Sequence, residues 1–593
     1  MIKLNYKLRN NFSKTENCLN EILMARGVED VERFLHPTEQ NELDPYLLTD
    51  IEKGRDLLVK HLKANSKILF VIDCDADGFT SSSILWLYIK IVYPQANLFF
   101  TVHEEKQHGL EDKIDWLEED EHYDLVILPD ASSYDVEYHQ RLETVGTDVL
   151  CIDHHEQLFD ENKNPIVSNG KNVVVINNQL SDRYENKSLC GAGVVYKFCQ
   201  VLDDYFNISI AKNFIDLVAL GEISDVMFQG TSETRYLIMK GLSNIKNKGF
   251  QSLLEAQSFS LKEKADYPFI GLTPIDVAFY VSPLINAITR VGTVAEKELM
   301  FLGFVDPMRE VKSTKRGAKP NDKEYACRQL GRIAGNIRNR QNREKEKAID
   351  LLEQRVFKEG LTENNILVIE VFEEDKIRKT LTGLIAAHFV SKFNRPCLIG
   401  RMSDDGFLRG SMRSNNNFES LPNFKEYLEK TDMFEYIAGH TAAAGYSLPE
   451  KNIDNFINFS NRNLNSEDFR NCYSVDYIFD ASEKEIALVG KIIGKAENCF
   501  GNGVDEVKVA IKNIPLTDYF LMGTDKNTVK ISYNGVDYIA FKDSNFAEEV
   551  KENSSKKLNI ISRFKLNTWA GKTTVQCIIE DYEFVESEDR FSF

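Results

Sequence analysis

Hydrophobic runs and helical segments alternate between about residues 66 and 225. This alternation predicts a parallel sheet whose strands are joined by crossover helices. The clearest strands are expected at residues 67–72, 124–128 and 148–152, and each run is closely followed by an acidic residue. Because open parallel sheets bind ligands at the carboxyl ends of their strands, the pattern predicts one acidic site at this edge.

The pattern changes twice further along the chain. A charged stretch with few helix breakers, from about residue 321 to 356, predicts one long helix that connects two lobes. A second α/β segment follows, with strand, helix and strand expected at 365–371, 381–393 and 397–400. From about residue 470 the strands alternate, and hairpin turns are expected at 534–535 and 569–571, which predicts a small β-barrel.

Composition places the chain among large globular proteins of the cell interior. Its 593 residues are 42% hydrophobic, and their number suggests about four domains. No stretch reaches the roughly 18 to 20 continuous apolar residues of a membrane helix, and the first residues lack the apolar run of a secretion signal. The ten cysteines include no CxxC pair. A cytoplasmic protein without membrane contact is therefore expected.

The formal net charge of −20 argues against a nucleic-acid partner, because phosphate binding is driven by Lys and Arg. The charge is unevenly spread, however. Residues 309–347 contain thirteen Lys or Arg against five Asp or Glu. This stretch is either a track for a phosphate backbone or an ordinary solvated helix face.

Three aspartates alternate directly after the first predicted strand, in FVIDCDADGFTSSS at residues 70–83. Carboxylates this close repel one another unless cations lie among them, so Asp73, Asp75 and Asp77 are candidate residues of a metal site. Calcium loops and Asx turns share this spacing. An EF-hand is disfavoured because a strand precedes the motif and loop position 12 lacks the expected Glu.

Acidic residues and histidines also follow the other predicted strands. Asp130 lies in VILPDASS, while CIDHHEQ contains Asp153, His154 and His155. Neutral imidazole binds metals, and adjacent His side chains cannot point the same way, so one is expected to bind metal while the other faces substrate. Asp225 ends an apolar helix in LVALGEISDVM. Two cations held by such groups could activate water and neutralise the phosphate oxygens of a phosphodiester.

Taken together, DCDADG, PDASS, DHH and ALGEISD resemble the four motifs of the DHH phosphoesterases in order and approximate spacing. The resemblance implies two divalent cations, Mn²⁺ or Mg²⁺, with Asp75, Asp77, Asp130, His154 and Asp225 as ligands. Asp73 and Asp153 would support these ligands. His155 would contact the phosphate or assist proton transfer.

The remaining sequence resembles the RecJ family within these phosphoesterases over almost its whole length. Segments that carry the resemblance include ARGVEDVERFLHPTEQ, LCGAGVVYKF, SPLINAITRVG, RGSMRS and AGHTAAAGYS. The resemblance implies a 5′→3′ exonuclease that acts on single-stranded DNA in repair and recombination. The substrate contacts that it implies are Asn286, Arg290, Arg409, Ser411, Arg413, Gly439 and His440. Weaker nucleic-acid candidates are Arg338, Arg340 and Arg343 in the basic stretch and Arg563, Phe564, Trp569 and Lys572 near the C-terminus.

The expected fold class is α/β, with two α/β lobes of the DHH and DHHA1 types joined by a long helix and followed by a β-barrel of the oligonucleotide-binding (OB) type. The expected divisions are an N-terminal segment on the DHH domain, the DHH catalytic domain, a basic connecting helix, a DHHA1 substrate domain and the barrel, at 1–65, 66–310, 311–358, 359–468 and 469–593.

Two alternatives remain open at this point. One is an RNA-directed 5′ exonuclease or oligoribonuclease, because the metal-site residues do not read the sugar. The other is a non-catalytic scaffold that binds single strands, although such relatives usually lose metal carboxylates. Single-stranded DNA is the expected partner, and a single-stranded-DNA-binding protein or a helicase is a candidate protein partner.

Overall fold

The computed structural model describes residues 4–105, 107–119, 121–156, 158–160, 166–168, 170–569 and 571–586. They form two compact units. The first unit comprises Met24–Gln341 and Asn498–Asp505. The second comprises the described parts of Met1–Leu23, Asn342–Glu497 and Glu506–Phe593.

A five-stranded parallel sheet forms the centre of the first unit, in the order β3-β2-β4-β5-β6. Its strands are β2 (Ile68–Ile72), β3 (Leu98–Val102), β4 (Leu125–Pro129), β5 (Asp148–Asp153) and β6 (Val173–Asn177). All residues of β2, β4 and β5 are buried, which explains why these strands appear in the sequence as continuous hydrophobic runs. The three strands expected from those runs are confirmed.

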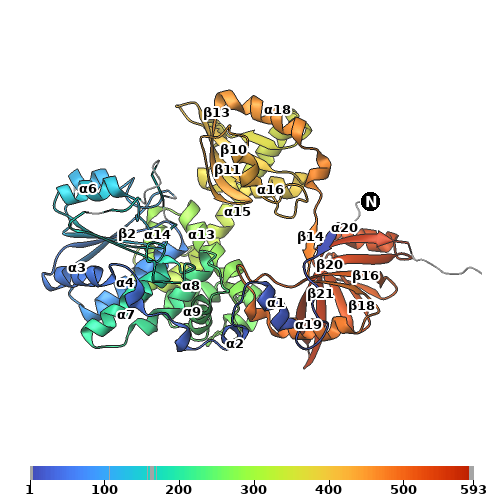
Figure 1. Ribbon diagram of the computed structural model, residues 1–593, viewed down its shortest axis with the longest axis horizontal. Coiled ribbons are helices and arrows are strands. Elements are labelled where there is room, and N and C mark those ends of the chain that lie inside the picture. The colour runs from blue at the N-terminus through green and yellow to red at the C-terminus, as the bar shows by residue number, and fades with distance from the viewer. Residues whose placement is uncertain are drawn as a thin grey trace, which may run out of the picture. The chain divides into compact units, whose positions relative to one another are not determined.

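Helices cover both faces of this sheet (Figure 1). One face packs against α5 (Ile114–Glu119) and α6 (Val136–Thr144), whose Ile114, Leu117 and Leu142 join side chains of the strands in one core. The other face packs against α3 (Ile51–Lys63), α4 (Ala76–Val92) and α7 (Gly191–Phe206). The remaining longer helices of the unit are α1 in part (Cys18–Ala25), α2 (Val31–Leu35), α8 (Ile215–Ser224), α9 (Ser232–Leu242), α10 (Lys248–Glu255), α13 (Ser282–Val291) and α14 (Val294–Val305).

The long charged helix is confirmed as α15 (Ala326–Lys358), which begins later than expected. A hairpin of β7 (Glu310–Lys312) and β8 (Lys323–Tyr325) precedes it, so the first part of the division expected at 311–358 is not helical. The loop between these strands contains Gly317, whose φ of 82° is incompatible with a continuous helix. In the same loop the N–H of Lys319 donates to Oδ2 of Asp322 at 2.8 Å.

A mixed sheet with the order β12-β13-β11-β10-β9 forms the second α/β domain, which lies in the second unit. The strands are β9 (Leu367–Glu370), β10 (Cys397–Met402), β11 (Phe407–Arg413), β12 (Tyr436–His440) and β13 (Ala443–Pro449). Only β9 and β10 pair in parallel. Helix α16 (Thr382–Phe393) packs on β10 and β11, and the outer helices are α17 (Phe424–Glu429) and α18 (Ile453–Asn463).

The C-terminal sheet has the order β15-β16-β20-β21-β19-β18-β17. Its strands are β15 (Tyr477–Asp480), β16 (Lys508–Pro515), β17 (Tyr519–Met522), β18 (Thr528–Tyr533), β19 (Val536–Ala540), β20 (Lys557–Trp569) and β21 (Lys572–Val585), with helices α19 (Glu485–Lys495) and α20 (Ser544–Glu552). Both expected hairpins are present, between β18 and β19 and between β20 and β21.

The N-terminal segment differs from the expectation that all of residues 1–65 pack on the first α/β domain. Strand β1 (Tyr6–Leu8) pairs in parallel with β14 (Tyr473–Val475), and Leu4 is buried with Val475 and Ile561. Burial of these apolar side chains places residues 4–23 with the C-terminal domain, while 24–65 lie with the parallel sheet.

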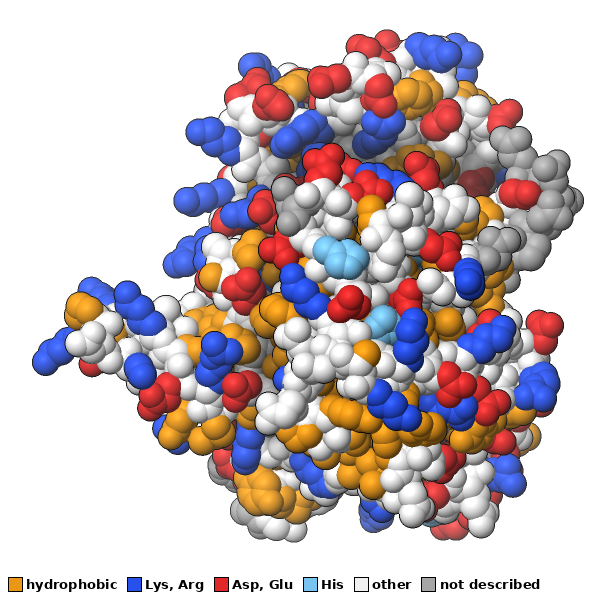
Figure 2. Space-filling view, turned by 90° about the vertical axis from the view of Figure 1, so that its left-hand side faces the viewer, with side chains coloured by type: hydrophobic (Ala, Val, Ile, Leu, Met, Phe, Trp, Pro, Cys, Tyr) orange, Lys and Arg blue, Asp and Glu red, His pale blue; other side chains and the backbone are white. Residues whose placement is uncertain are grey.

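Within the described residues, no helix is both long and apolar enough to cross a membrane. All ten cysteines are free. On the face shown in Figure 2, the coloured Lys and Arg side chains are interspersed with Asp and Glu.

Candidate metal and phosphodiester site

The DCDADG motif connects the end of β2 to the start of α4. Asp75 is the N-cap of α4, and its Oδ1 accepts hydrogen bonds from the backbone N–H groups of Asp77 and Gly78 at 3.0 and 3.1 Å. Asp77 lies in the first turn of the helix and is buried. A Cβ at Gly78 would lie 2.5 Å from the Asp73 carbonyl oxygen, so this tight turn requires glycine.

A second helix N-terminus holds the carboxylate of Asp77. Its Oδ2 accepts a hydrogen bond from the N–H of Gly191 at 2.5 Å, and its Oδ1 accepts one from Ala192 at 3.0 Å. Both donors begin α7, where unpaired N–H groups favour a negative charge. Helix α8 approaches equally closely, because a Cβ at Gly221 would lie 2.6 Å from Asp77 Oδ1.

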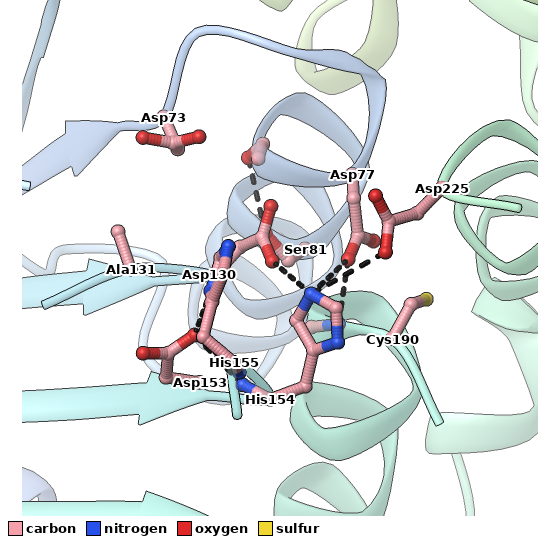
Figure 3. A network of polar contacts seen from close by, with 12 residues as sticks. Asp73, Asp77, Ser81, Asp130, Ala131, Asp153, His154, His155, Cys190 and Asp225 are labelled. Atoms are coloured by element: carbon pink, nitrogen blue, oxygen red, sulfur yellow. Dashed lines mark hydrogen bonds and ion pairs between the residues drawn. The ribbon is translucent and has the colours of Figure 1, made fainter. Parts of the chain in front are cut away.

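Three carboxylates converge on one imidazole nitrogen (Figure 3). His154 Nε2 lies 3.2 Å from Asp130 Oδ1, 3.4 Å from Asp225 Oδ2 and 3.8 Å from Asp77 Oδ2. These residues come from the ends of β4, α8 and β5 and from the start of α4. The structure thus brings together four of the five ligands that the sequence predicts.

The backbone at Asp130 is held in an unusual conformation, with a φ of 71°. Burial, and then the charges of Asp77 and Asp75, raise the pKa of Asp130 well above its ordinary value. Asp130 Oδ1 is buried and has no hydrogen-bond partner among the described residues. Carboxylates gathered this closely in the interior fit a bound cation, which would favour their charged forms.

The same donor set indicates which cations fit. Burial lowers the pKa of His154, so its ring is neutral and can donate a lone pair. Carboxylate oxygens with an imidazole suit Mn²⁺, and Mg²⁺ accepts the oxygen ligands. Asp77, Asp130, His154 and Asp225 are therefore suited to hold one divalent cation.

Asp153 orients the His–His pair. Its Oδ1 accepts hydrogen bonds from the N–H of His154 at 2.7 Å and from Nδ1 of His155 at 2.7 Å, and its Oδ2 accepts one from the N–H of Ser133. Burial acts to lower the pKa of His155, but the bond to Asp153 and its charge outweigh this effect and raise it to about 9. The bond to Asp153 thus fixes the His155 ring beside the metal cluster, with its centroid 4.8 Å from that of His154.

A second cluster contains a residue that sequence reasoning missed. Ligand atoms of Asp73, Asp75 and His108 lie within 4.8 Å of one another. His108 follows β3 and lies 35 residues from Asp73, in a segment without a recognised motif. The only available signal was its position after the strand that neighbours β2.

The predicted nucleic-acid contacts on α13 and α15 lie in different surroundings. Asn286 and Arg290 lie on α13, and Arg290 is within electrostatic reach of Asp75 and Arg338. Arg340 instead binds Glu296 Oε2 at 2.7 Å and the Val291 carbonyl at 2.8 Å, which fastens α15 to its own unit. Arg338 hydrogen-bonds Gln341. Arg343 is exposed further along α15 in the second unit.

In the second α/β domain, Ser411 and Arg413 lie at the N-terminus of α16. Ser411 Oγ is 2.9 Å from Thr382 Oγ1, and a Cβ on Gly383 would overlap the Arg413 guanidinium. A helix N-terminus with a guanidinium beside it is suited to bind an anion.

The other residues predicted in this domain lie in different surroundings. Arg409 binds Asp405 Oδ2 at 2.6 Å. Gly439 has a φ of 134°, and a Cβ there would lie 2.7 Å from Ala443 O, so the hairpin itself requires this glycine. His440 is exposed at the end of β12.

The barrel residues require one correction. Phe564 is 5% exposed and packs against Gly490 of α19, so its ring belongs to the core and is not available to stack on a base. Arg563 forms ion pairs with Glu506 and Glu580. Lys572 is exposed, and the side chain of Trp569 lies outside the described residues.

Comparisons with known proteins agree with this architecture. Residues 67–222 match the DHH family, N-terminal domain, and residues 475–581 match the RecJ OB domain. The chain is 32% identical over 584 residues to the SPbeta prophage-derived single-strand DNA-specific exonuclease YorK of Bacillus subtilis (strain 168), covering 96% of this chain and 97% of the relative.

More distant relatives match over most of this chain and are themselves longer. The single-stranded-DNA-specific exonuclease RecJ of Bacillus subtilis (strain 168) is 22% identical over 575 residues, covering 94% of this chain and 67% of the relative. A crystal structure of RecJ in complex with Mn²⁺ from Thermus thermophilus matches with a TM-score of 0.69 at 18% identity, covering 96% of this chain and 76% of that one. This likeness shows the fold.

Proposed function

Because the chain belongs to the RecJ family of single-stranded-DNA-specific exonucleases, we propose that it hydrolyses phosphodiester bonds of single-stranded DNA from the 5′ end, with two divalent cations, in DNA repair and recombination. The observation that carries the proposal is the convergence of Asp77, Asp130 and Asp225 on His154 Nε2. Gathering buried carboxylates is costly unless a cation binds them, and the proposed hydrolysis requires that cation.

The proposed cation ligands are Asp75, Asp77, Asp130, His154 and Asp225. When bound, the cations would lower the pKa of water and neutralise charge on the phosphate oxygens. The protein holds the donors in place, because the start of α7 binds the Asp77 carboxylate and the N–H of Asp130 donates to the Ile152 carbonyl at 2.7 Å. Rigid donors matter because misplacement of reacting groups by about 1 Å can cost roughly 100-fold in rate.

Positive side chains next to the carboxylates would bind the scissile phosphate. His155, held by Asp153, and Arg290, within electrostatic reach of Asp75, are the residues proposed for this role. Asp153 engages Nδ1 of His155, which leaves Nε2 as the ring nitrogen proposed to meet the phosphate. Charge-assisted bonds of this kind contribute about 1.5–3 kcal/mol each.

Ser411 and Arg413 at the start of α16 are proposed to bind a terminal 5′-phosphate. A planar guanidinium can hold two phosphate oxygens at once, and the helix N-terminus adds favourable partial charge. Recognition of that terminus would give the enzyme its 5′ polarity.

Digestion of single strands labelled at either end tests this function. With Mn²⁺, a 5′-labelled strand is expected to release label as short products from the outset, whereas a 3′-labelled strand shortens progressively. Asp77→Asn and His154→Ala should abolish both patterns, and His122→Ala, an exposed histidine far from the described clusters, should not. Full activity in Asp77→Asn and His154→Ala would refute the site.

Matched RNA and duplex substrates complete the experiment. Carboxylate and imidazole ligands do not distinguish ribose from deoxyribose, so sugar preference must come from other residues of the chain. Faster digestion of the RNA strand would assign the chain to the RNA-directed alternative.

A further inference from the structure

The cluster of Asp73, Asp75 and His108 lies at the carboxyl ends of two neighbouring strands. Asp73 follows β2 directly, and His108 lies in the segment after β3, which pairs with β2 in parallel through Ile72 and Val102. One oxygen of each carboxylate and one ring nitrogen of His108 lie within 4.8 Å of one another. Parallel strand ends thus bring His108 to two carboxylates of the DCDADG motif, although it lies 35 residues after Asp73.

Asp73 has an unsatisfied oxygen in this cluster. The residue is 1% exposed, and its Oδ2 lies 2.6 Å from Nδ1 of His108. Its Oδ1 is buried and lacks a hydrogen-bond partner among the described residues. Figure 3 shows Asp73 apart from the carboxylates that meet at His154. A buried carboxylate oxygen without a partner is costly unless a ligand binds it.

Described residues on either side of His108 are hydrogen-bonded to other parts of the unit. Lys297 of α14 is 1% exposed, and its Nζ donates hydrogen bonds to the carbonyls of His103 and Glu104 at 2.9 and 2.8 Å. At the other end, Asp135 Oδ2 accepts a hydrogen bond from the N–H of Leu110 at 3.1 Å. Lys297 Nζ also lies 3.5 Å from Sγ of Cys74, so this buried ammonium holds the residues after β3 next to the DCDADG motif.

We propose that His108 is a ligand of the second cation, which it binds together with Asp73 and Asp75, and that its imidazole makes this position favour Mn²⁺ over Mg²⁺. The inference rests on the proposed two-cation function. Asp73 then becomes a ligand rather than a support for other ligands. Mg²⁺ prefers oxygen donors in strict octahedral geometry, whereas Mn²⁺ tolerates nitrogen, so an imidazole here discriminates between the two ions.

Binding of Mn²⁺ to the full chain, measured by the electron paramagnetic resonance signal of free Mn²⁺, tests the inference without relying on activity. The wild type is expected to bind two ions. His108→Ala should weaken one of them by about 10- to 100-fold and leave the other unchanged, the range found when groups around a metal are removed. His122→Ala is the matched control, because this histidine is exposed and outside the clusters.

His108→Asp provides a second variant in case the alanine variant folds poorly. It restores three donors but makes them all oxygens, so competition by Mg²⁺ against bound Mn²⁺ should become stronger than in the wild type. Unchanged Mn²⁺ stoichiometry and affinity in His108→Ala, or unchanged Mg²⁺ competition in His108→Asp, would overturn the inference.

The outcomes also separate this inference from the proposed function. If the wild type binds one Mn²⁺ and still degrades single strands, the second position is refuted while the nuclease function stands. If it binds no Mn²⁺ and leaves single strands intact, the nuclease function itself is refuted.

Discussion

Replacement of Gly191 by alanine should damage the metal site through a single methyl group. A Cβ at this position would lie 2.5 Å from Oδ1, 2.6 Å from Cβ and 2.8 Å from Cγ of Asp130. Ordinary contacts require about 3.5 Å, so Asp130 or the start of α7 must move by about 1 Å. Because the N–H of Gly191 also binds Asp77, that movement disturbs two predicted ligands.

The expected loss in rate is roughly 100-fold, since a 1 Å displacement of catalytic groups costs about that much. This factor corresponds to about 2.7 kcal/mol in activation free energy. Overpacking should also lower the free energy of unfolding by about 1–3 kcal/mol. Mn²⁺ affinity should fall together with the rate, because the same carboxylates are displaced.

The assay combines release of label from a 5′-labelled single strand, Mn²⁺ binding and urea unfolding. Gly335→Ala is the matched control, because a Cβ at Gly335 in α15 meets nothing within 4 Å. Gly335→Ala should keep its activity and gain up to about 1 kcal/mol in stability. A wild-type rate and wild-type Mn²⁺ affinity in Gly191→Ala would show that the packing of α7 against Asp130 is not what positions the ligands.

Three further expectations concern other parts of the chain. Burial lowers the pKa of His139 from 6.5 to about 4, so on acidification the unfolded chain takes up this proton before the folded chain does. The free energy of unfolding is therefore unaffected by His139 above pH 6.5 and falls by about 3 kcal/mol as the pH is lowered to 4. In urea unfolding, His139→Phe should lose less stability between pH 6.5 and pH 4 than the wild type does. The same pH dependence of the free energy of unfolding in both proteins would contradict this expectation. Phe564→Ala should cost about 3–5 kcal/mol of stability, whereas Lys572→Ala should cost little but weaken binding of a single strand measured by fluorescence anisotropy. In an Asp77→Asn background, Arg413→Ala should weaken binding of a 5′-phosphorylated strand about tenfold relative to a 5′-hydroxyl strand, and equal effects on both would argue against a 5′-phosphate site.

Much of the fold was predictable because the hydrophobic pattern is unambiguous where strands are buried on both faces. Strands β2, β4 and β5 follow continuous apolar runs, and the acidic residues after them mark the ligand edge of the sheet. The N-terminal segment was less predictable. Strand β1 has only three residues, and its partner β14 lies more than 460 residues away, so no local pattern reveals the pairing.

The charged candidates show a second limit of sequence reasoning. Arg340 and Arg563 have the composition expected of phosphate-binding residues, yet Glu296 and the pair Glu506 and Glu580 neutralise them. Phe564 belongs to the barrel core for a similar reason, because register alone decides which face of a strand is buried. These assignments depend on neighbours that are remote in the chain.

The sequence by itself determined the kinds of donor atoms, the strands that precede them along the chain and the family to which the chain belongs. Tertiary structure alone decided that Asp77, Asp130 and Asp225 meet at His154, that Asp73 is grouped with His108, and that Gly191 must lack a side chain. The physical reason is that periodicity specifies which face of an element is buried, whereas distances of a few ångströms between side chains depend on how separate elements pack.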